Sequence, residues 1–105
     1  MFEIFFTETA NKKLNKILNK VQLEEIKIFC VKHLRFHPHK VGDPLSYSFL
    51  REKKISGKRL YYLVYVDLNI VLIVDISNKK QQKETIHKIK NLLSEYKVYV
   101  KKLLE

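Results

Sequence analysis

The stretch that decides the fold is Phe49-Leu-Arg-Glu-Lys-Lys-Ile-Ser-Gly-Lys-Arg-Leu-Tyr-Tyr-Leu-Val-Tyr65, followed after a short break by Ile70-Val-Leu-Ile-Val-Asp-Ile76. The breaks within it, Ser56-Gly57-Lys58 and Asp67-Leu68-Asn69, are short and polar. Breaks of about three residues join antiparallel neighbours, because a parallel connection needs a dozen residues or more. The stretch therefore predicts an antiparallel β-meander, with strands over Ser46–Lys54, Arg59–Val66 and Ile70–Ile76.

The last of these strands gives the first information about what covers the sheet. Ile70–Ile76 is apolar at six of its seven positions. An antiparallel strand with one face in water alternates apolar and polar side chains. Because this strand does not alternate, we expect both faces of the sheet to be covered.

The N-terminal third predicts a short strand and two helices. Phe2–Phe6 is an apolar run with strand propensity, and Thr7 or Thr9 can cap the helix that follows. A second helix is predicted from Leu23 to about Arg35, and the short break between the helices favours an αα-hairpin on one face of the meander. Apolar residues of the first helix recur at helical spacing: Ala10, Leu14, Ile17, Leu18 and Val21.

The C-terminal quarter is helical again from Gln81, and this helix can cover part of the other face. Unbroken to Glu105, it would be about 37 Å long at roughly 1.5 Å per residue, more than a domain of this size needs. Whether it is one helix or bends stays open. The predicted order is β-α-α-β-β-β-α, an α+β fold in a single domain over residues 1–105. Its apolar stripe comprises Ile86, Ile89, Leu93, Tyr96, Val100 and Leu103.

Composition narrows the class of protein. The 21 Lys and Arg residues outnumber the 11 Asp and Glu residues, so the net charge is +10. This charge fits a nucleic-acid binder, although a solvated lysine surface would look the same. Cys30 is the only cysteine, which excludes an internal disulfide and four-cysteine zinc sites. There is no signal-peptide pattern, and the apolar run Leu60–Ile76 is broken by polar residues, so we expect a cytoplasmic protein without a membrane span.

Cations gather around the first predicted hairpin turn. Residues two apart share a face of a strand, which places Arg51 and Lys53 together, and Arg59 together with Tyr61 and Tyr65. Arginine and tyrosine on an open sheet face suit RNA, because guanidinium binds phosphate in a forked geometry and phenol rings stack on unpaired bases. The alternative is that both tyrosines pack beneath the C-terminal helix. The cations of this cluster are Arg51, Lys53, Lys54, Lys58 and Arg59.

Other groups of residues give weaker evidence of a functional site. His33, His37 and His39 lie near Asp43, but the His37-Pro38-His39 loop lacks a cysteine partner and favours an exposed turn over a metal site. There is no glycine-rich phosphate loop, and we expect neither a metal nor a small-molecule cofactor. Histidine is the side chain that usually changes charge near neutral pH. His87 follows the last strand closely, so it is either a functional group at the open sheet face or a surface histidine.

The stretch Phe49–Tyr65, followed by Ile70–Lys80 and preceded by Gly42-Asp43-Pro44-Leu45, resembles the core of the RelE/ParE toxin superfamily. In that family a basic strand enters a hairpin, an arginine opens the next strand, and a basic loop leads to a final helix. The resemblance is specific between about Gly42 and Glu84. It implies a toxin of a type II toxin–antitoxin system, bound by a cognate, acidic antitoxin.

For RelE-like members the resemblance implies a ribosome-dependent endoribonuclease, which cleaves messenger RNA on the ribosome without metal and so inhibits translation. The 2′-hydroxyl of the RNA attacks the neighbouring phosphate, which needs a proton acceptor, cations and an acid. By position, Arg59 matches the arginine that stabilises the phosphate, and Arg51, Lys53 and Lys54 match the basic strand. Further candidates for RNA or phosphate binding are Lys58, Tyr61, Lys79 and Lys80.

One departure from the family pattern keeps other functions open. The tyrosine that RelE-like members carry in the last helix falls on Ile86 when counted from Lys80, and His87 is the nearest candidate acid. One alternative is a ParE-like toxin that inhibits DNA gyrase and is no nuclease. The other is a catalytically inactive member that only binds a partner.

Overall fold

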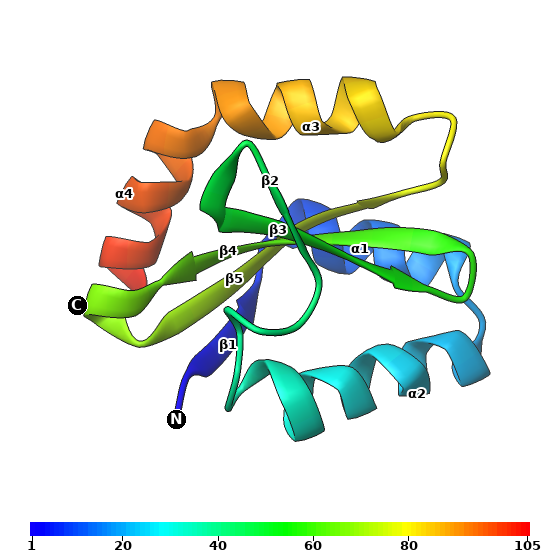
Figure 1. The fold of residues 1–105 in the computed structure, drawn as a ribbon, viewed down its shortest axis with the longest axis horizontal. Helices are drawn as coiled ribbons and strands as arrows, with labels where there is room; N and C mark the ends of the chain where they lie inside the picture. Colours follow the sequence, from blue (N-terminus) through cyan, green and yellow to red (C-terminus); the bar gives the residue numbers. More distant parts are fainter.

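The computed structural model describes residues 1–105 and has a five-stranded mixed sheet at its centre, in the order β1-β5-β4-β3-β2 (Figure 1). The predicted α+β class is confirmed, and the predicted antiparallel meander is confirmed as β3, β4 and β5. The strands are β1 (Glu3–Phe6), β2 (Asp43–Leu45), β3 (Tyr47–Ile55), β4 (Lys58–Tyr65) and β5 (Ile70–Ser77).

The turn between β3 and β4 fixes the register of the basic hairpin. It consists of Ser56 and Gly57, whose φ angles are 51° and 75°. Two successive residues with positive φ give the turn whose twist matches that of antiparallel strands. The turn is one residue shorter than predicted, so Lys58 belongs to β4 and pairs with Ile55.

Two further strands, one at each edge, complete the sheet. Phe2–Phe6 is confirmed as a strand, and β1 pairs parallel with β5, beginning at Glu3 opposite Ile70. The predicted turn Gly42-Asp43-Pro44 is corrected, because Asp43 and Pro44 lie in β2, which pairs antiparallel with β3. A proline is tolerated there, since an edge strand needs hydrogen bonds on one side only.

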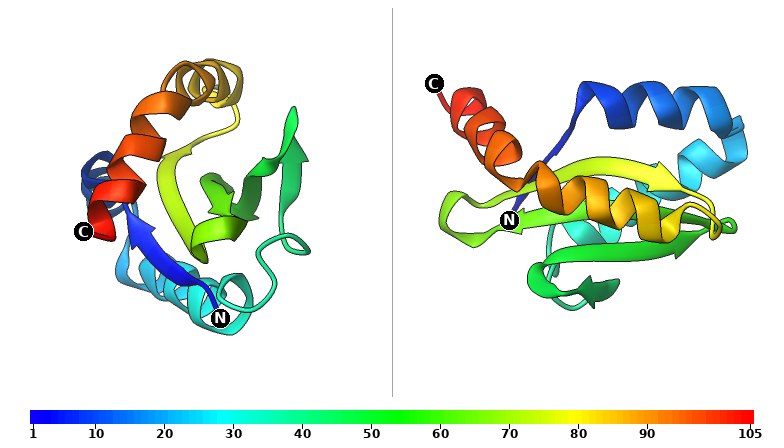
Figure 2. Two further views of the ribbon diagram at one scale, coloured as in Figure 1. Left: turned by 90° about the vertical axis from the view of Figure 1, so that its left-hand side faces the viewer. Right: turned by 90° about the horizontal axis from the view of Figure 1, so that it is seen from above.

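The predicted αα-hairpin is confirmed as α1 (Glu8–Ile17) and α2 (Lys20–Phe29), which continues into a π-helical turn over Cys30–Leu34. Thr7 caps α1 by accepting from the Ala10 N–H, and Asn19 forms a capping box with Gln22 at the start of α2. Both helices lie against one face of the sheet (Figure 2). The apolar cluster on this face, the α2 face, is formed by Ala10, Leu14, Leu18, Ile26, Phe29, Cys30, Leu34, Leu60, Tyr62, Val64, Val71, Ile73 and Ile76.

The opposite face is covered by two helices, α3 (Gln82–Asn91) and α4 (Leu93–Leu103), which settles the question left open by the sequence. They meet at Leu92, whose φ of −106° and ψ of 9° are not helical, and the chain turns sharply there (Figures 1 and 2). The longest dimension of the molecule is 33 Å, so a straight helix would overhang the sheet. None of the helices combines the length and apolar character that crossing a bilayer requires. The cluster on this face, the α3 face, comprises Leu50, Tyr61, Leu63, Ile70, Leu72, Val74, Ile89 and Val100.

Candidate functional site

Strand register places the basic residues of the β3–β4 hairpin on opposite faces of the sheet. Lys54 lies opposite Arg59, and Glu52 lies opposite Tyr61. Directly opposite residues share a face, and Tyr61 belongs to the cluster on the α3 face. Arg51 and Lys53 alternate with Glu52 and Lys54 along β3, and they therefore lie on the α2 face. These two members of the predicted cation cluster therefore do not share a face with Arg59.

Arg51 has a structural environment. Its Nε donates to the Val41 carbonyl at 3.1 Å, Nη2 donates to the Gly42 carbonyl at 3.1 Å, and Nη1 donates to the Ser48 carbonyl at 3.3 Å. Arg51 is 8% exposed. All three guanidinium nitrogens thus donate to backbone carbonyls, two in the loop that precedes β2 and one in β3, which leaves Arg51 unsuited to binding phosphate.

Lys53 and Lys58 also lie away from Arg59. The Lys53 ammonium lies 5.7 Å from the centre of the Phe29 ring, an attractive cation–π arrangement against α2. Lys58 pairs with Ile55, which packs against the apolar cluster of the α2 face. Neither cation shares a face with Arg59.

Arg59 differs from the other arginines in having no partner. Arg59 is 8% exposed, it forms no ion pair, and its buried Nε has no hydrogen-bond acceptor. A buried, unpaired charge is costly, and guanidinium groups bind oxyanions through forked, charge-assisted hydrogen bonds. Arg59 therefore presents a guanidinium group suited to binding an anion on the α3 face.

Tyr61 lies beside Arg59 but is fully buried. Its hydroxyl is 2.8 Å from Ser77 Oγ, and Ser77 pairs with Arg59 across β4 and β5. Burial raises the pKa of Tyr61, and the charges of Glu52 and Arg59 act on that pKa in opposite directions. The alternative that Tyr61 packs beneath the C-terminal helices is confirmed, and its ring has no free surface on which a base could stack.

Glu52 and Gln82 complete this group, although sequence analysis assigned a role to neither of them. Glu52 is 5% exposed, and Gln82 Nε2, at the start of α3, donates to both oxygens of its carboxylate at 2.9 Å. A carboxylate can accept a proton from a reacting hydroxyl. Glu52 lies two residues before Lys54, and this spacing alone predicts that both lie on the same face of the strand. No local pattern marked Gln82 or Ser77.

The remaining predicted residues lie around the start of α3. Lys54, Lys79 and Lys80 are exposed. His87 is exposed as well, 3.3 Å from Asn91 Nδ2, and lines a hollow of about 680 Å³ on the outer side of α3. Ile86 is half-buried and packs against the cluster of the α3 face. No residue of β3 or β4 lines this hollow, whose lining is Lys80, Lys83, Glu84, Ile86, His87 and Lys90.

The three histidines of the first half each contact an aromatic ring. His33 lies beside Phe29, His37 beside Phe36, and His39 packs edge-on against Phe2. The protein brings no three His, Cys, Asp or Glu side chains together in a way that could hold a metal ion.

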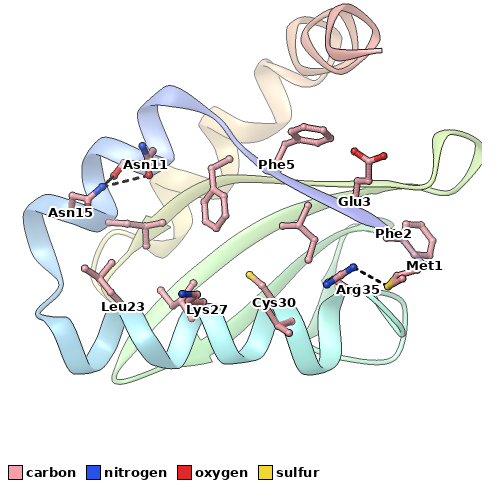
Figure 3. Close-up of a pocket in the computed structure, with 15 residues that line it drawn as sticks. Met1, Phe2, Glu3, Phe5, Asn11, Asn15, Leu23, Lys27, Cys30 and Arg35 are labelled. Carbon is pink, nitrogen blue, oxygen red and sulfur yellow. Dashed lines mark hydrogen bonds between the residues drawn. The ribbon is translucent and has the colours of Figure 1, made fainter.

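A second concave feature lies beside β1, between this edge strand and the helices α1 and α2 (Figure 3). It is a mainly apolar groove of about 590 Å³. Lys27 and Arg35 add cationic groups, and Arg35 Nη2 lies 3.0 Å from the sulfur of Met1. The groove combines apolar depth, positive charge and an unpaired strand edge. Its apolar lining includes Ile4, Phe6, Leu14, Leu23, Ile26 and Val31.

Comparison with known proteins identifies the fold through solved structures. A scan against protein-family models finds no match, and a search of curated proteins finds none either. A chain of the RelBE2 toxin–antitoxin complex of Mycobacterium tuberculosis aligns with a TM-score of 0.65 and 25% identity, over 74% of this chain and 91% of that chain. The isolated E. coli RelE toxin aligns with a TM-score of 0.64 and 20% identity, over 85% and 99%.

A third similar structure extends the comparison to archaea. The RelE–RelB complex of Pyrococcus horikoshii contains a chain that aligns with a TM-score of 0.50 and 15% identity, over 74% of this chain and 94% of that chain. In each case the alignment spans nine-tenths or more of the other chain. These alignments show that the chain has the fold of the RelE/ParE toxin superfamily.

Proposed function

We propose that this protein is the toxin of a type II toxin–antitoxin pair and acts in the cytoplasm as a ribosome-dependent endoribonuclease. The observation that carries the proposal is the buried, unpaired guanidinium of Arg59 beside the Glu52 carboxylate, on the sheet face covered by α3. Similarity in fold to the RelE structures supports the toxin assignment. The RNA-cleaving step rests on the chemistry of the site.

In the proposed reaction the 2′-hydroxyl of the RNA attacks the adjacent phosphate. Arg59 binds the phosphate and stabilises the charge that develops on its oxygens, and Lys54, directly opposite Arg59, adds a second cation. Glu52 takes the proton of the attacking hydroxyl. His87 and Lys80 are the candidate proton donors to the leaving oxygen.

The direct test measures translation-coupled cleavage of messenger RNA by the wild type and by Arg59→Ala. Loss of a preorganised donor to a developing oxyanion lowers the rate by about 100-fold or more, so we expect Arg59→Ala to be inactive. Arg35→Ala is the matched control, because Arg35 lies at the groove beside β1. Equal cleavage by the wild type and Arg59→Ala would remove Arg59 from the mechanism.

His87→Ala tests whether His87 acts together with Arg59. His87 lines the hollow on the outer side of α3, which contains no residue of β3 or β4. We therefore expect this variant to retain more cleavage than Arg59→Ala, measured in the same assay. A loss as complete as that of Arg59→Ala would show that the RNA passes over the outer side of α3.

We further propose that the groove beside β1 binds an extended, acidic segment of the antitoxin. The Glu3 N–H donates to Asn69, and the Thr7 N–H donates to Ile73 on β5, so alternation turns the main-chain groups of Ile4 and Phe6 toward the free edge. An added strand would pair with these groups, and its apolar side chains would enter the groove. The net charge of +10 and the cations Lys27 and Arg35 favour an acidic partner.

Charge reversal tests this docking site. The binding partner for this test is the acidic antitoxin that the proposed function implies. Lys27→Glu and Arg35→Glu should weaken its binding and raise the salt sensitivity of what remains, whereas Lys102→Glu in α4 should change binding little. Equal losses in all three variants would show that net charge alone, and not the groove, attracts the partner.

A second function is favoured by one observation. Ile86, at the position where RelE-like members carry tyrosine, packs toward the core and offers no acidic or stacking group. A ParE-like toxin that inhibits DNA gyrase needs no such group. Inhibition of supercoiling, with messenger RNA left intact, would select this function over RNA cleavage, and expression without growth arrest would indicate an inactive member.

A further inference from the structure

Glu52 and Arg59 lie close together and yet do not form an ion pair. They are diagonal neighbours across β3 and β4, because Glu52 pairs with Tyr61, two residues beyond Arg59. Diagonal positions are about 7–8 Å apart, within reach of two long side chains. Both side chains are almost fully buried, where opposite charges attract most strongly. The protein nevertheless forms only two ion pairs, Lys12–Glu8 and Lys13–Asp75.

The Glu52 carboxylate is bound by Gln82 instead. A single amide nitrogen of Gln82 donates to both oxygens of the Glu52 carboxylate, at 2.9 Å each. This contact joins the first residue of α3 to β3 and turns the carboxylate toward the helix. Arg59 is left with its Nε unpaired.

We propose that Gln82 is a positioning residue that holds the Glu52 carboxylate away from Arg59, so that the guanidinium stays free to bind a phosphate group. Without Gln82, the carboxylate would turn to Arg59 and occupy the donors that the phosphate needs. The inference rests on the proposed function in one respect, which is that the ligand of Arg59 is a phosphate.

The three arginines of the chain make the test direct, because each contributes one Nε–Hε signal to a nitrogen-15 NMR spectrum. Arg59→Lys identifies the Arg59 signal. In the wild type, this signal should move as inorganic phosphate is added. In Gln82→Ala, it should already be displaced before phosphate is added, and the affinity for phosphate should fall by about 10- to 100-fold, the effect of one competing charge-assisted hydrogen bond.

Rescue distinguishes positioning from a general structural role. In the double variant Gln82→Ala/Glu52→Gln no carboxylate can compete, so the Arg59 signal should return toward its wild-type position and phosphate affinity should recover. Gln81→Ala, at the exposed neighbouring position, is the matched control and should behave as the wild type. Gln82→Met keeps the bulk of the side chain and should reproduce the loss if Gln82→Ala proves unstable.

Unchanged phosphate affinity and an unmoved Arg59 signal in Gln82→Ala would overturn the proposal, as would a double variant that fails to recover. Failure of the proposed function would look different. If the wild-type Arg59 signal ignores phosphate but is displaced in Gln82→Ala, then Gln82 positions Glu52 and the ligand of Arg59 is not phosphate.

Discussion

The two glycines of the chain, Gly42 and Gly57, provide a matched pair for testing how the loop before β2 is held. Both have positive φ, 69° and 75° respectively. A methyl group on Gly57 would meet nothing within 4 Å, whereas one on Gly42 would lie 2.5 Å from the Glu52 carbonyl oxygen and 2.6 Å from the Tyr62 hydroxyl. Both Gly42→Ala and Gly57→Ala therefore carry the cost of placing an alanine at positive φ. Only Gly42→Ala adds a steric collision.

The expected free energies follow from these contacts. A left-handed conformation costs an alanine about 1–2 kcal/mol, which applies to both variants. In Gly42→Ala the Tyr62 hydroxyl must also leave the Val41 carbonyl, to which it donates at 2.5 Å. Leaving a buried hydroxyl unpaired costs about 1–3 kcal/mol more. We expect Gly57→Ala to lower the free energy of unfolding by about 1–2 kcal/mol and Gly42→Ala by about 2–5 kcal/mol.

Urea denaturation followed by circular dichroism measures both values. The difference between the variants isolates the collision, because the change in the unfolded chain is the same in each. Equal losses would mean that the loop before β2 does not lie against Tyr62 and Glu52, and the reasoning about Arg51 as its anchor would fail with it.

Three further predictions concern buried groups. Lys13→Ala should lower the free energy of unfolding, measured by urea denaturation, by about 1–3 kcal/mol, because it removes the ammonium group 2.7 Å from the buried Asp75 carboxylate. Lys12→Ala should leave the free energy of unfolding unchanged, because the pair between Lys12 and Glu8 is exposed. Burial raises the pKa of Cys30 to about 12, so a thiol reagent at pH 8 should react with it only after urea unfolds the protein. Burial also raises to about 12 the pKa values of three phenols, which favours their protonated form in the folded state. These phenols are Tyr62, Tyr65 and Tyr96. Their contribution to the free energy of unfolding is complete below about pH 10 and is lost as the pH rises toward 12. Absorbance at 295 nm would follow the ionisation of the phenols, and denaturation across this pH range would follow the loss of stability.

Much of the fold could be predicted because its signals are local. Short polar breaks predicted the meander, and helical spacing predicted the αα-hairpin. The break at Leu92 could not be predicted, since no glycine or proline marks it. The edge strand β2 was hidden in the same way, because Asp43 and Pro44 are typical turn residues.

The candidate site was predicted in part, for a reason that concerns register. A period of two shows which residues of one strand share a face, but only the pairing between strands shows which faces coincide. The two-residue turn at Ser56 and Gly57 pairs Lys54 with Arg59. Arg51 and Lys53 are thereby excluded from the Arg59 face, although all four cations are close in sequence. Gln82 reaches the site only through the packing of α3, which no local pattern encodes.

A bulge in β5 decides the surroundings of Arg59. Tyr62 pairs with Ile73, but Tyr61 pairs with Asp75, so Val74 is an extra residue in β5. Without it, the register would place Ile76 opposite Arg59 and would turn Asp75 toward Leu60 and the apolar cluster of the α2 face. With it, Ser77 lies opposite Arg59, and Asp75 faces away from that cluster and binds Lys13. Thr7, the cap of α1, donates to the Val74 carbonyl at 3.3 Å, which ties the first helix to the extra residue. The apolar run Ile70–Ile76 alone does not reveal this shift, and yet the shift places a hydroxyl instead of an isoleucine beside the unpaired guanidinium.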